Sequence, residues 1–373
     1  MVNGQKAYAA AGVDTAAGDS AVELMRSAIA RTMTDDVVDA VGGFAGMIDA
    51  SALRNYRRPL LATSTDGVGT KIAIAQAMGV HHTIGQDLVG MVVDDIAVVG
   101  ARPLLMTDYI ACGRVIPERI ASIVRGVARA CEYVKVPLLG GETAEHPGVM
   151  EPDDYDIAGA ATGVVEADAV LGAQRVREGD VIVAMAASGL HSNGYSLVRR
   201  IVADAGWKLD KEVPEFGRTL GEELLEPTRL YSPLCLDLAA RATVHAFSHV
   251  TGGGLAANLA RVIPVGLQAR IDRGEVEVPV VFRVLCELGS VGWNDAEDTW
   301  NLGVGMVAVL PTQDADMVTT VCREYDCTAW PIGSVAAASA EEAVDGSTGT
   351  GARLISGTKG VAGGSVLLHG EYR

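Results

Sequence analysis

The chain has 373 residues, nearly half of them apolar, and its formal net charge at pH 7 is -17. This length suggests two domains with cores of their own. The strong negative charge, without any basic stripe, argues against nucleic acid or an anionic membrane as a partner. An anionic substrate would need cations or backbone dipoles at its binding site.

No apolar stretch reaches the length of a membrane span, because charged or turn residues interrupt each one. The N-terminus lacks a basic segment followed by an apolar one, so we expect no signal peptide. The six cysteines are scattered, and no His or Cys pair completes a zinc site. We therefore expect reduced, buried thiols and a cytoplasmic location.

The first predicted elements surround a stretch rich in glycine. Residues 1–20 are small and polar and are predicted to form a loop, and a helix is predicted over residues 20–33. The apolar run 59–62 is typical of a buried strand. Ser64-Thr65-Asp66-Gly67-Val68-Gly69-Thr70-Lys71 follows, and a helix is predicted over 72–78. The glycines let backbone N–H groups approach a phosphate, and the carboxylate can hold a hard cation. An Asp-Gly pair at a strand end is nevertheless more often a plain turn.

The next predicted helix runs from Gly85 to Val99 and carries two adjacent aspartates. The neighbours of Asp95 on its helix face are apolar, so we expect Asp95 on the buried side. Asp94 lies on another face, where solvent could reach it. A buried carboxylate is costly unless it is paired or holds a metal, and either explanation fits Asp95.

A strand over 103–113 carries Asp108, and a helix over 117–134 follows it. A short strand, 136–139, then runs into Gly140-Gly141-Glu142-Thr143, a second strand end with glycines, a carboxylate and a hydroxyl. A folded sheet could bring Asp66, Asp95 and Glu142 together. Converging oxygens are what Mg²⁺ requires, with waters and phosphates completing its octahedron.

A strand over 156–165 completes the first domain, and the polar, turn-rich stretch 166–179 marks the boundary. The second domain opens with a strand over 180–187, which runs into a loop and then a helix from about Ser196 to Ala205. Within the loop, the small donors Ser188, Ser192 and Asn193 lie beside a helix N-terminus, which suits an anion. An ordinary N-cap with a turn is the simpler alternative.

A second glycine-rich loop follows the strand that ends at His249. Val250-Thr251-Gly252-Gly253-Gly254 lies directly before a helix, so its backbone can close on a phosphate. The other elements predicted for this domain are helices over 228–241, 281–288 and 315–325 and strands over 303–310 and 329–335. We expect residues 336–364 to have low order and 366–368 to form a last edge strand. The predicted domains are thus 1–168, 169–340 and a tail, 341–373.

The chain has neither a Walker A motif nor a Gly-x-Gly-x-x-Gly strand–helix unit, so phosphate binding must use another fold. Six motifs instead occur in order and closely resemble the family of aminoimidazole ribonucleotide synthetase, also called phosphoribosylformylglycinamidine cyclo-ligase. The resemblance runs from about residue 7 to residue 335. Its motifs are Thr65-Asp66-Gly67-Val68-Gly69-Thr70-Lys71, Ile84-Gly85-Gln86-Asp87-Leu88, Gly140-Gly141-Glu142-Thr143-Ala144-Glu145, His191-Ser192-Asn193-Gly194-Tyr195-Ser196-Leu197-Val198-Arg199, His249-Val250-Thr251-Gly252-Gly253-Gly254 and Gly303-Val304-Gly305-Met306.

The resemblance implies an α/β chain of two domains with mixed sheets, and a homodimer whose N-terminal sheets join in a β-barrel. It also implies an ATP-dependent ring closure that converts formylglycinamidine ribonucleotide to aminoimidazole ribonucleotide, through an iminophosphate, in purine biosynthesis. ATP would bind at the N-terminal domain and the dimer interface. By motif, Mg²⁺ would fall on Asp66, Asp95 and Glu142.

The resemblance assigns further roles residue by residue. His191 would polarise the amide oxygen or move a proton, although a hydrogen-bonded structural histidine is the alternative. The implied catalytic residues are His191, Asn193 and Lys71. The implied nucleotide contacts are Gly67, Val68, Gly69, Thr70, Thr143 and Asp108, and the implied substrate contacts are Ser192, Thr251, Gly252 and Gly253.

Two departures from the family pattern stand out. Ala9 occupies a position where the family leads us to expect lysine, and Asp298 one where arginine is usual. One alternative is therefore a catalytically impaired paralogue that only binds nucleotide. Another is a different ATP-dependent phosphotransferase of the superfamily. The selenide enzyme would need a Cys in residues 1–20, and the carbamoyl enzyme one at the C-terminus; this chain has neither.

Overall fold

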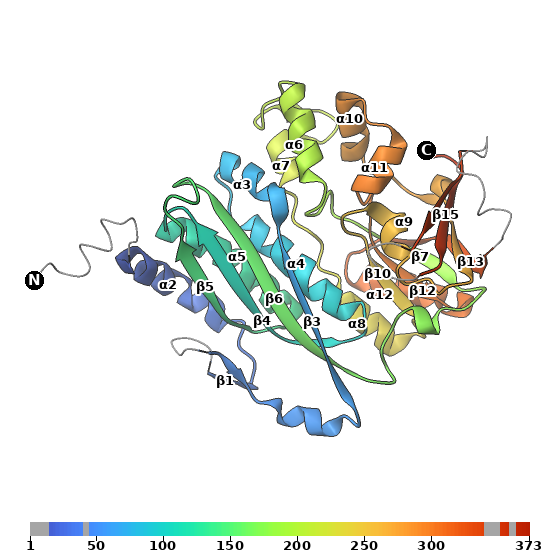
Figure 1. Ribbon diagram of the computed structural model, residues 1–373, viewed down its shortest axis with the longest axis horizontal. Helices are drawn as coiled ribbons and strands as arrows, with labels where there is room; N and C mark the ends of the chain where they lie inside the picture. Colours follow the sequence, from blue (N-terminus) through green and yellow to red (C-terminus); the bar gives the residue numbers. More distant parts are fainter. Residues whose placement is uncertain (1–14, 40–44, 339–350, 358–362) are drawn as a thin grey trace, which may run out of the picture. The chain divides into compact units, whose positions relative to one another are not determined.

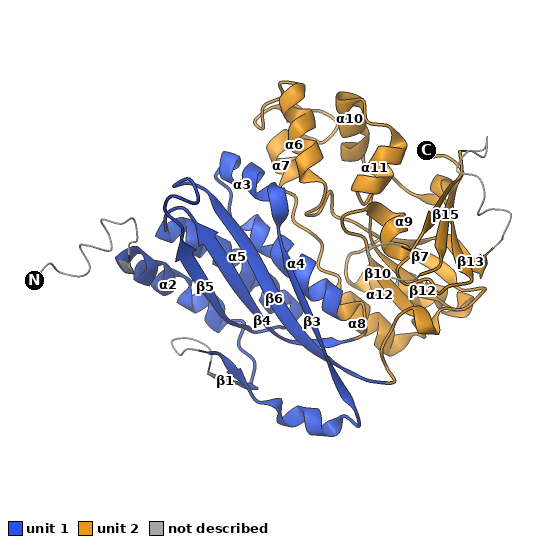
Figure 2. Cartoon of the chain, in the orientation of Figure 1, with its two compact units in different colours: residues 1–96, 101–167 blue, residues 97–100, 168–373 orange. Residues whose placement is uncertain are grey.

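The computed structural model describes residues 15–39, 45–338, 351–357 and 363–373. The chain forms two compact units, coloured separately in Figure 2. Unit 1 holds residues 1–96 and 101–167, and unit 2 holds 97–100 and 168–373. Within the described ranges, every helix is too short or too polar to cross a membrane.

Unit 1 combines helices with a sheet (Figure 1). Its helices are α2 (Thr15–Ala30), α3 (Ile72–Met78), α4 (Thr83–Ala97) and α5 (Pro117–Val134), with short 3₁₀ turns at Ala50–Asn55 and Gly69–Lys71. Its strands are β1 (Val37–Asp39), β2 (Met47–Ile48), β3 (Pro59–Gly67), β4 (Arg102–Cys112), β5 (Leu138–Glu145) and β6 (Tyr155–Glu166).

The main sheet of unit 1 has the strand order β3-β6-β4-β5, in which only the β4–β5 pair is parallel. Helices α4 and α5 cover one face. Glycines in β6 allow helix α4 to approach the sheet closely, because a Cβ at Gly163 would lie only 2.4 Å from the side chain of Ile96. On β4, Met106 meets Cys131 of α5 with 3.8 Å between the sulfur atoms. The core of unit 1 therefore lies between this face and its helices.

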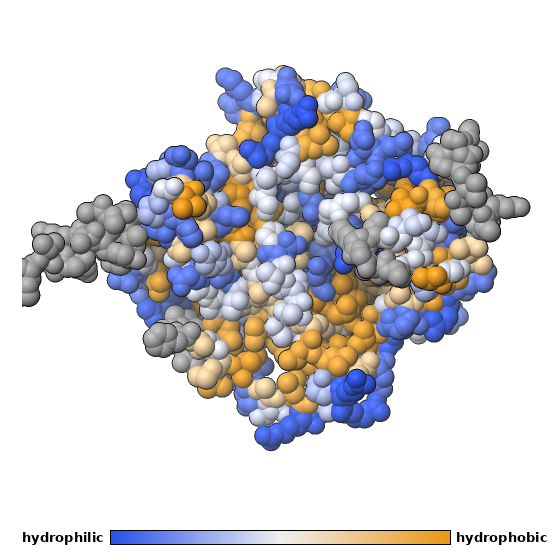
Figure 3. Space-filling view, in the orientation of Figure 1, coloured by the Kyte–Doolittle hydropathy of each residue, from blue (hydrophilic) through white to orange (hydrophobic). Residues whose placement is uncertain are grey.

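No described helix covers the other face of this sheet. The side chains of Leu61 on β3 and Tyr109 on β4 point to this side, and they are 64% and 41% exposed. Figure 3 shows a mixed surface over the strands of unit 1, with apolar patches beside neutral and polar ones. Antiparallel sheets can leave one face to solvent, but large apolar side chains exposed on such a face are typical of an interaction surface.

Unit 2 is built around a larger mixed sheet. Its helices are α6 (Tyr195–Asp204), α7 (Leu220–Leu224), α8 (Ser232–Arg241), α9 (Gly254–Leu259), α10 (Val280–Gly289), α11 (Trp293–Thr299) and α12 (Ala315–Glu324). Its strands are β7 (Val181–Ala186), β8 (Glu212–Val213), β9 (Arg218–Thr219), β10 (Ala246–His249), β11 (Leu267–Asp272), β12 (Val304–Leu310), β13 (Ala329–Ala337), β14 (Arg353–Ser356) and β15 (Ser365–His369), with 3₁₀ turns at Ala173–Arg175, Arg273–Glu275 and Thr312–Asp314.

The large sheet has the order β10-β12-β7-β13-β11-β15-β14. Its pairs are antiparallel except β11–β15, which is parallel. Every residue of β12 is buried, as its continuous apolar run predicts for a central strand. Helices α8 and α12 pack their apolar faces against β7, β10 and β12 to form a hydrophobic core in unit 2.

Most predicted elements are confirmed, and the helix over 117–134 is α5 to the residue. The apolar run 59–62 does form a strand, but the prediction that it is buried is wrong, since Leu60 and Leu61 are exposed. Four predictions about the elements and their positions are wrong. Thr15 to Ser20 belong to helix α2 and not to a loop, and β5 begins at Leu138 and runs through the glycines to Glu145. The stretch 336–364 was predicted to have low order, but its residues Arg353–Ser356 form strand β14. Strand β14 pairs with β15, so β15 is not the predicted edge strand of the sheet.

The predicted orientation of helix α4 is also wrong. Asp95 is exposed, and Asp94 is fully buried. The helix is buried on nearly all sides between Ile84 and Asp94, so its apolar residues do not mark a single buried face. The prediction of buried thiols is confirmed, since all six cysteines are free and buried.

Candidate active site

The first candidate loop follows strand β3. Asp66 is exposed, and its Oδ1 accepts a hydrogen bond of 2.7 Å from the N–H of Gly67. Gly69 has φ +69°, in the left-handed region that favours glycine, and Thr70 is exposed. Val68 is buried and anchors the turn. Residues Gly67 to Thr70 thus form a fixed, solvent-facing turn at the end of a strand.

Lys71 ends this turn but does not reach the surface. Its side chain is fully buried, and its Nζ lies 2.8 Å from Oδ1 of Asp87, which is also fully buried. This ion pair fastens the turn to helix α4. A buried ion pair is held firmly once formed, because removing one partner leaves the other charged in a medium of low polarity. In this arrangement Lys71 contacts Asp87 and not the surface, which favours a structural role; a catalytic role for Lys71 stays a prediction.

The three predicted metal ligands do not converge within one chain. The register places Asp66, Gly159, Asp108 and Gly141 in one row across the sheet. Glu142 lies one residue beyond this row, so its side chain points to the opposite face from Asp66. The two strands are also three spacings apart, or about 14 Å. Among the residues described, no group of three His, Cys, Asp or Glu is placed to hold a metal ion.

Asp108 lies on the helix-covered face of the same sheet. Its Oδ2 is buried without a hydrogen-bond partner, and a Cβ at Gly141 would lie 1.7 Å from its Oδ1. Burial raises the pKa of Asp108 to about 7, against an ordinary 3.8. Thr143, the other predicted nucleotide contact on this side of the sheet, is half-buried on β5 beside Ile110 of β4.

In unit 2, the loop after β7 carries the predicted catalytic histidine. His191 is 1% exposed and adopts φ +59°. Its Nε2 accepts a hydrogen bond of 3.2 Å from the N–H of Ser188, and its ring lies 6.0 Å from that of Tyr231. The ring also fills the space beside Gly305, where a Cβ would lie 2.5 Å from Cε1. This placement supports the structural alternative for His191 rather than direct contact with a substrate.

The two predicted loops of unit 2 are joined. Oδ1 of Asn193 accepts a hydrogen bond of 3.0 Å from the N–H of Gly252. Ser192 is buried, and Thr251 and Gly252 are partly exposed. Gly253 and Gly254 have φ +98° and +71°, which only glycine adopts without strain. The structure therefore brings Asn193 and the Thr251–Gly253 segment together, as one site requires.

Two buried asparagines that the sequence did not single out support these loops. Nδ2 of Asn258 donates to the carbonyls of Thr251 and Gly254, at 3.1 and 2.8 Å. Nδ2 of Asn301 donates to the carbonyl of Gly189 at 2.9 Å. Asn258 follows Gly254 by one helical turn, and a polar residue there in an apolar helix was the available signal.

Both parts of the chain match models of one protein class. Residues 48–165 match the N-terminal domain of "AIR synthase related protein", and residues 177–346 match its C-terminal domain. Among solved structures, thiamine-monophosphate kinase from Stenotrophomonas maltophilia K279a superposes with a TM-score of 0.64 at 21% identity, covering 84% of this chain and 93% of that one. A hydrogenase maturation protein HypE in complex with ATP gives 0.60 at 19% identity, covering 92% of each chain. These two define the fold alone.

Comparison with individual sequence relatives defines a narrower family within this class. The chain is 45% identical over 313 residues to the phosphoribosylformylglycinamidine cyclo-ligase of Desulfitobacterium hafniense (strain DSM 10664 / DCB-2), which covers 84% of this chain and 91% of the relative. The enzyme of that name from Thermosynechococcus vestitus is 44% identical over 337 residues, covering 90% and 97%. The chain belongs to the phosphoribosylformylglycinamidine cyclo-ligase family.

Proposed function

We propose that the chain closes the imidazole ring of aminoimidazole ribonucleotide from formylglycinamidine ribonucleotide, with conversion of ATP to ADP and phosphate. The observation that carries this proposal is the 45% identity to a cyclo-ligase over 91% of that relative. In unit 2, the loops 188–194 and 250–254, called here the two glycine-rich loops, are joined through Asn193 and Gly252, and this supports the proposal. A phosphorylated substrate needs backbone donors, because the chain is strongly acidic.

The chemistry requires activation of a poor leaving group. The formamide oxygen attacks the γ-phosphorus of ATP, and the bond from phosphorus to the bridging oxygen breaks to release ADP. An amidine nitrogen then attacks the activated carbon, loses a proton and expels the former amide oxygen as inorganic phosphate. Such a transfer depends on positioning and charge neutralisation more than on covalent catalysis by the protein.

We assign the nucleotide phosphates to the turn formed by Gly67 to Thr70. ATP would arrive as its Mg²⁺ complex, so a single carboxylate beside the phosphates suffices, and exposed Asp66 is the candidate. The substrate contacts proposed are Ser192, Thr251, Gly252 and Gly253, with Asn193 orienting the second loop. His191 holds its own loop and does not enter the reaction in this proposal.

Two further features belong to this proposal. The uncovered face of the unit 1 sheet, which carries Leu61 and Tyr109, would pair with the same face of a second copy. A location in the cytoplasm follows from the role proposed in purine biosynthesis. Ala9 lies outside the described residues, and Asp298 is ion-paired to Arg353. An impaired paralogue is the alternative to this proposal.

The test is an assay of ADP release by the purified chain with MgATP, with and without formylglycinamidine ribonucleotide. We expect ADP, phosphate and aminoimidazole ribonucleotide in equal amounts, the product being identified by mass spectrometry. Release of ADP only with selenide, thiamine phosphate or a carbamoyl compound would replace the proposal by another superfamily reaction. Nucleotide binding without turnover of any of them would identify an impaired paralogue.

A further inference from the structure

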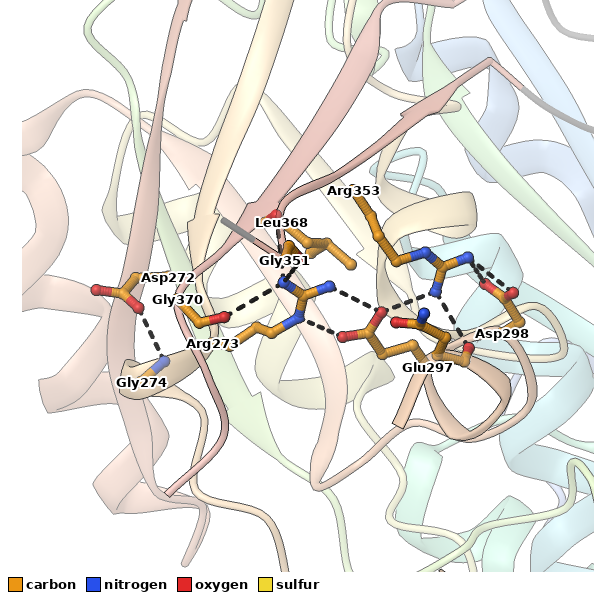
Figure 4. A network of polar contacts seen from close by, with 10 residues as sticks. Asp272, Arg273, Gly274, Glu297, Asp298, Gly351, Arg353, Leu368 and Gly370 are labelled. Carbon is orange, nitrogen blue, oxygen red and sulfur yellow. Dashed lines mark hydrogen bonds and ion pairs between the residues drawn. The ribbon is translucent and has the colours of Figure 1, made fainter. Parts of the chain in front are cut away.

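Four charged side chains form a connected network in unit 2 (Figure 4). The guanidinium of Arg273 donates to both oxygens of Glu297, with Nη2 3.2 Å from Oε2. Nη1 of Arg353 lies 2.8 Å from the same Oε2, and its Nη2 binds both oxygens of Asp298, at 2.9 and 3.1 Å. Two arginines therefore enclose one carboxylate, and a second carboxylate extends the network.

The network joins three segments that are far apart in the sequence. Arg273 follows strand β11, Glu297 and Asp298 belong to helix α11, and Arg353 opens strand β14. Nη1 of Arg273 also donates to the carbonyls of the C-terminal segment, at 3.0 to 3.3 Å: those of Gly351, Leu368 and Gly370. The C-terminal strands are thus tied to α11 by charge as well as by strand pairing.

Burial makes this connection strong. The side chain of Glu297 is 4% exposed and that of Arg273 is 6% exposed, so neither charge is stable there without the other. Arg353 is partly exposed, and the Asp298 side chain is 58% exposed. The plane of the Arg353 guanidinium is fixed by two contacts together, from Nη1 to Glu297 and from Nη2 to Asp298. A substitution at Arg353 would therefore loosen α11 and leave the Arg273–Glu297 pair in place.

Helix α11 in turn supports both loops of the candidate active site. A Cβ at Gly254 would lie 1.7 Å from the carbonyl oxygen of Glu297, and one at Gly194 would lie 2.4 Å from Trp300. Asn301, two residues after the helix, binds the carbonyl of Gly189. The helix is packed against the loops so closely that a displacement of it must displace them.

We propose that Arg353 and Asp298 are positioning residues, which hold helix α11 and through it the two glycine-rich loops in the geometry that binds the ribonucleotide. This inference rests on the proposed function and assigns a role to the C-terminal segment that carries Arg353. Arg353 and Asp298 act through α11 and do not touch the substrate.

The experiment compares the full-length wild-type chain with Arg353→Gln, Asp298→Asn and the double variant. We expect Arg353→Gln to raise KM for formylglycinamidine ribonucleotide roughly tenfold and to leave KM for ATP unchanged. A tenfold change lies within the range of interaction free energies measured between residues of one network. The double variant should show no larger rise than Arg353→Gln alone, because the two residues act as one pair. Arg353→Lys, which keeps the charge, should recover part of the loss.

The matched control is Arg241→Gln. Arg241 makes a bidentate contact with Glu324, at 2.7 and 2.9 Å, and this pair joins α8 to α12 instead of reaching α11. We expect wild-type KM values from it. Titration calorimetry of the ribonucleotide without ATP gives a second measurement, in which Arg353→Gln should weaken binding by the same factor.

The outcomes separate the two proposals. A wild-type chain that neither binds nor converts the ribonucleotide overturns the proposed function and this inference with it. If the wild type is active, unchanged KM in Arg353→Gln overturns the inference alone. The same conclusion follows if both KM values rise together, or if melting temperature falls while KM stays constant, since a purely structural pair would behave in that way.

Discussion

The aspartates of unit 1 show how much a single residue depends on its surroundings. Asp66 is exposed at the end of β3, Asp94 is fully buried in α4, and Asp108 has a buried oxygen on the helix-covered face of the sheet. The same carboxyl group is thus available to a ligand at Asp66, enclosed by the protein at Asp94 and shifted toward its neutral form at Asp108.

We expect Asp66→Asn to reduce turnover roughly 10- to 100-fold, because the substitution removes the charge that would meet the Mg²⁺ complex of ATP. Since Asp66 is exposed, the free energy of unfolding should change by less than about 0.5 kcal/mol. Steady-state kinetics over a range of Mg²⁺ concentrations and urea unfolding check both parts.

The control for this prediction is Asp49→Asn. Asp49 is likewise exposed, and its Oδ1 accepts a backbone hydrogen bond, of 2.8 Å from the N–H of Ser51. It should retain full turnover. Full activity in Asp66→Asn would instead remove Asp66 from the nucleotide site.

Asp108 predicts a pH dependence of stability. Its pKa in the folded chain is about 7, against 3.8 as the ordinary value. Between these two values the folded state binds more protons than the unfolded state, so stability falls as pH rises through this window. Between pH 5 and pH 8 the titration of Asp108 should lower the free energy of unfolding of the wild type by roughly 2 to 3 kcal/mol. The Asp108→Asn variant should not show this loss.

Urea unfolding of both proteins at pH 5 and pH 8 measures that difference. Comparison of the wild type with the variant cancels the titration of all other groups. An equal pH dependence in the two proteins would show that Asp108 is charged throughout the range.

At the scale of elements, the glycine-rich loops depend on helix α11. Their turn residues are visible in the sequence, but the supports come from elsewhere in the chain: Asn258, Asn301 and the backbone of Glu297. A loop whose backbone must present donors to a phosphate needs such supports, because an unsupported glycine segment is costly to order.

Gly254→Ala tests the contact between the second loop and α11. The added Cβ would lie 1.7 Å from the carbonyl oxygen of Glu297, at a position with φ +71°. We expect a loss of roughly 3 kcal/mol or more in unfolding free energy and a raised KM for the ribonucleotide. Circular dichroism melting and steady-state kinetics provide the measurements.

Gly217→Ala is the matched control, because Gly217 has φ +66° and nothing lies within 4 Å of its added Cβ. It should lose only the roughly 1 to 2 kcal/mol of left-handed strain, with unchanged KM. Equal effects of the two substitutions would mean that packing on α11 contributes nothing to the loop.

At the scale of the whole molecule, the uncovered sheet face of unit 1 is the main unexplained surface. One face of β3-β6-β4-β5 is covered by α4 and α5, and the other carries Leu61 and Tyr109 exposed. A second copy with the same face is the partner that a two-fold interface would bring.

We expect Leu61→Glu to weaken a wild-type dimer at least roughly 100-fold, because the interface would bury a charge from each copy without a partner. Sedimentation velocity over a range of protein concentrations measures this. Val265→Glu, at a side chain that is 73% exposed in unit 2, should leave the dimer intact. A monomeric wild type, or a Leu61→Glu dimer of normal affinity, would contradict the proposed pairing.

Most elements of the fold were predictable because local signals define them. The helix over 117–134 was predicted with its bounds, and the apolar run of β12 predicted a strand over 303–310. Orientation was less predictable. Helix α4 is apolar nearly all round, so its pattern could not show which aspartate faces solvent, and Asp94 and Asp95 were assigned the wrong way round.

By itself, the sequence determined the two-unit α/β organisation, the glycine-rich loops and the family, since these depend on local pattern and on ordered motifs. Only the tertiary structure decided which residues meet. Strand order separates Asp66 from Glu142, folding buries Lys71 and His191, and β14 brings Arg353 to Asp298. Such contacts join residues far apart in the chain, and no local pattern encodes the register and packing that create them.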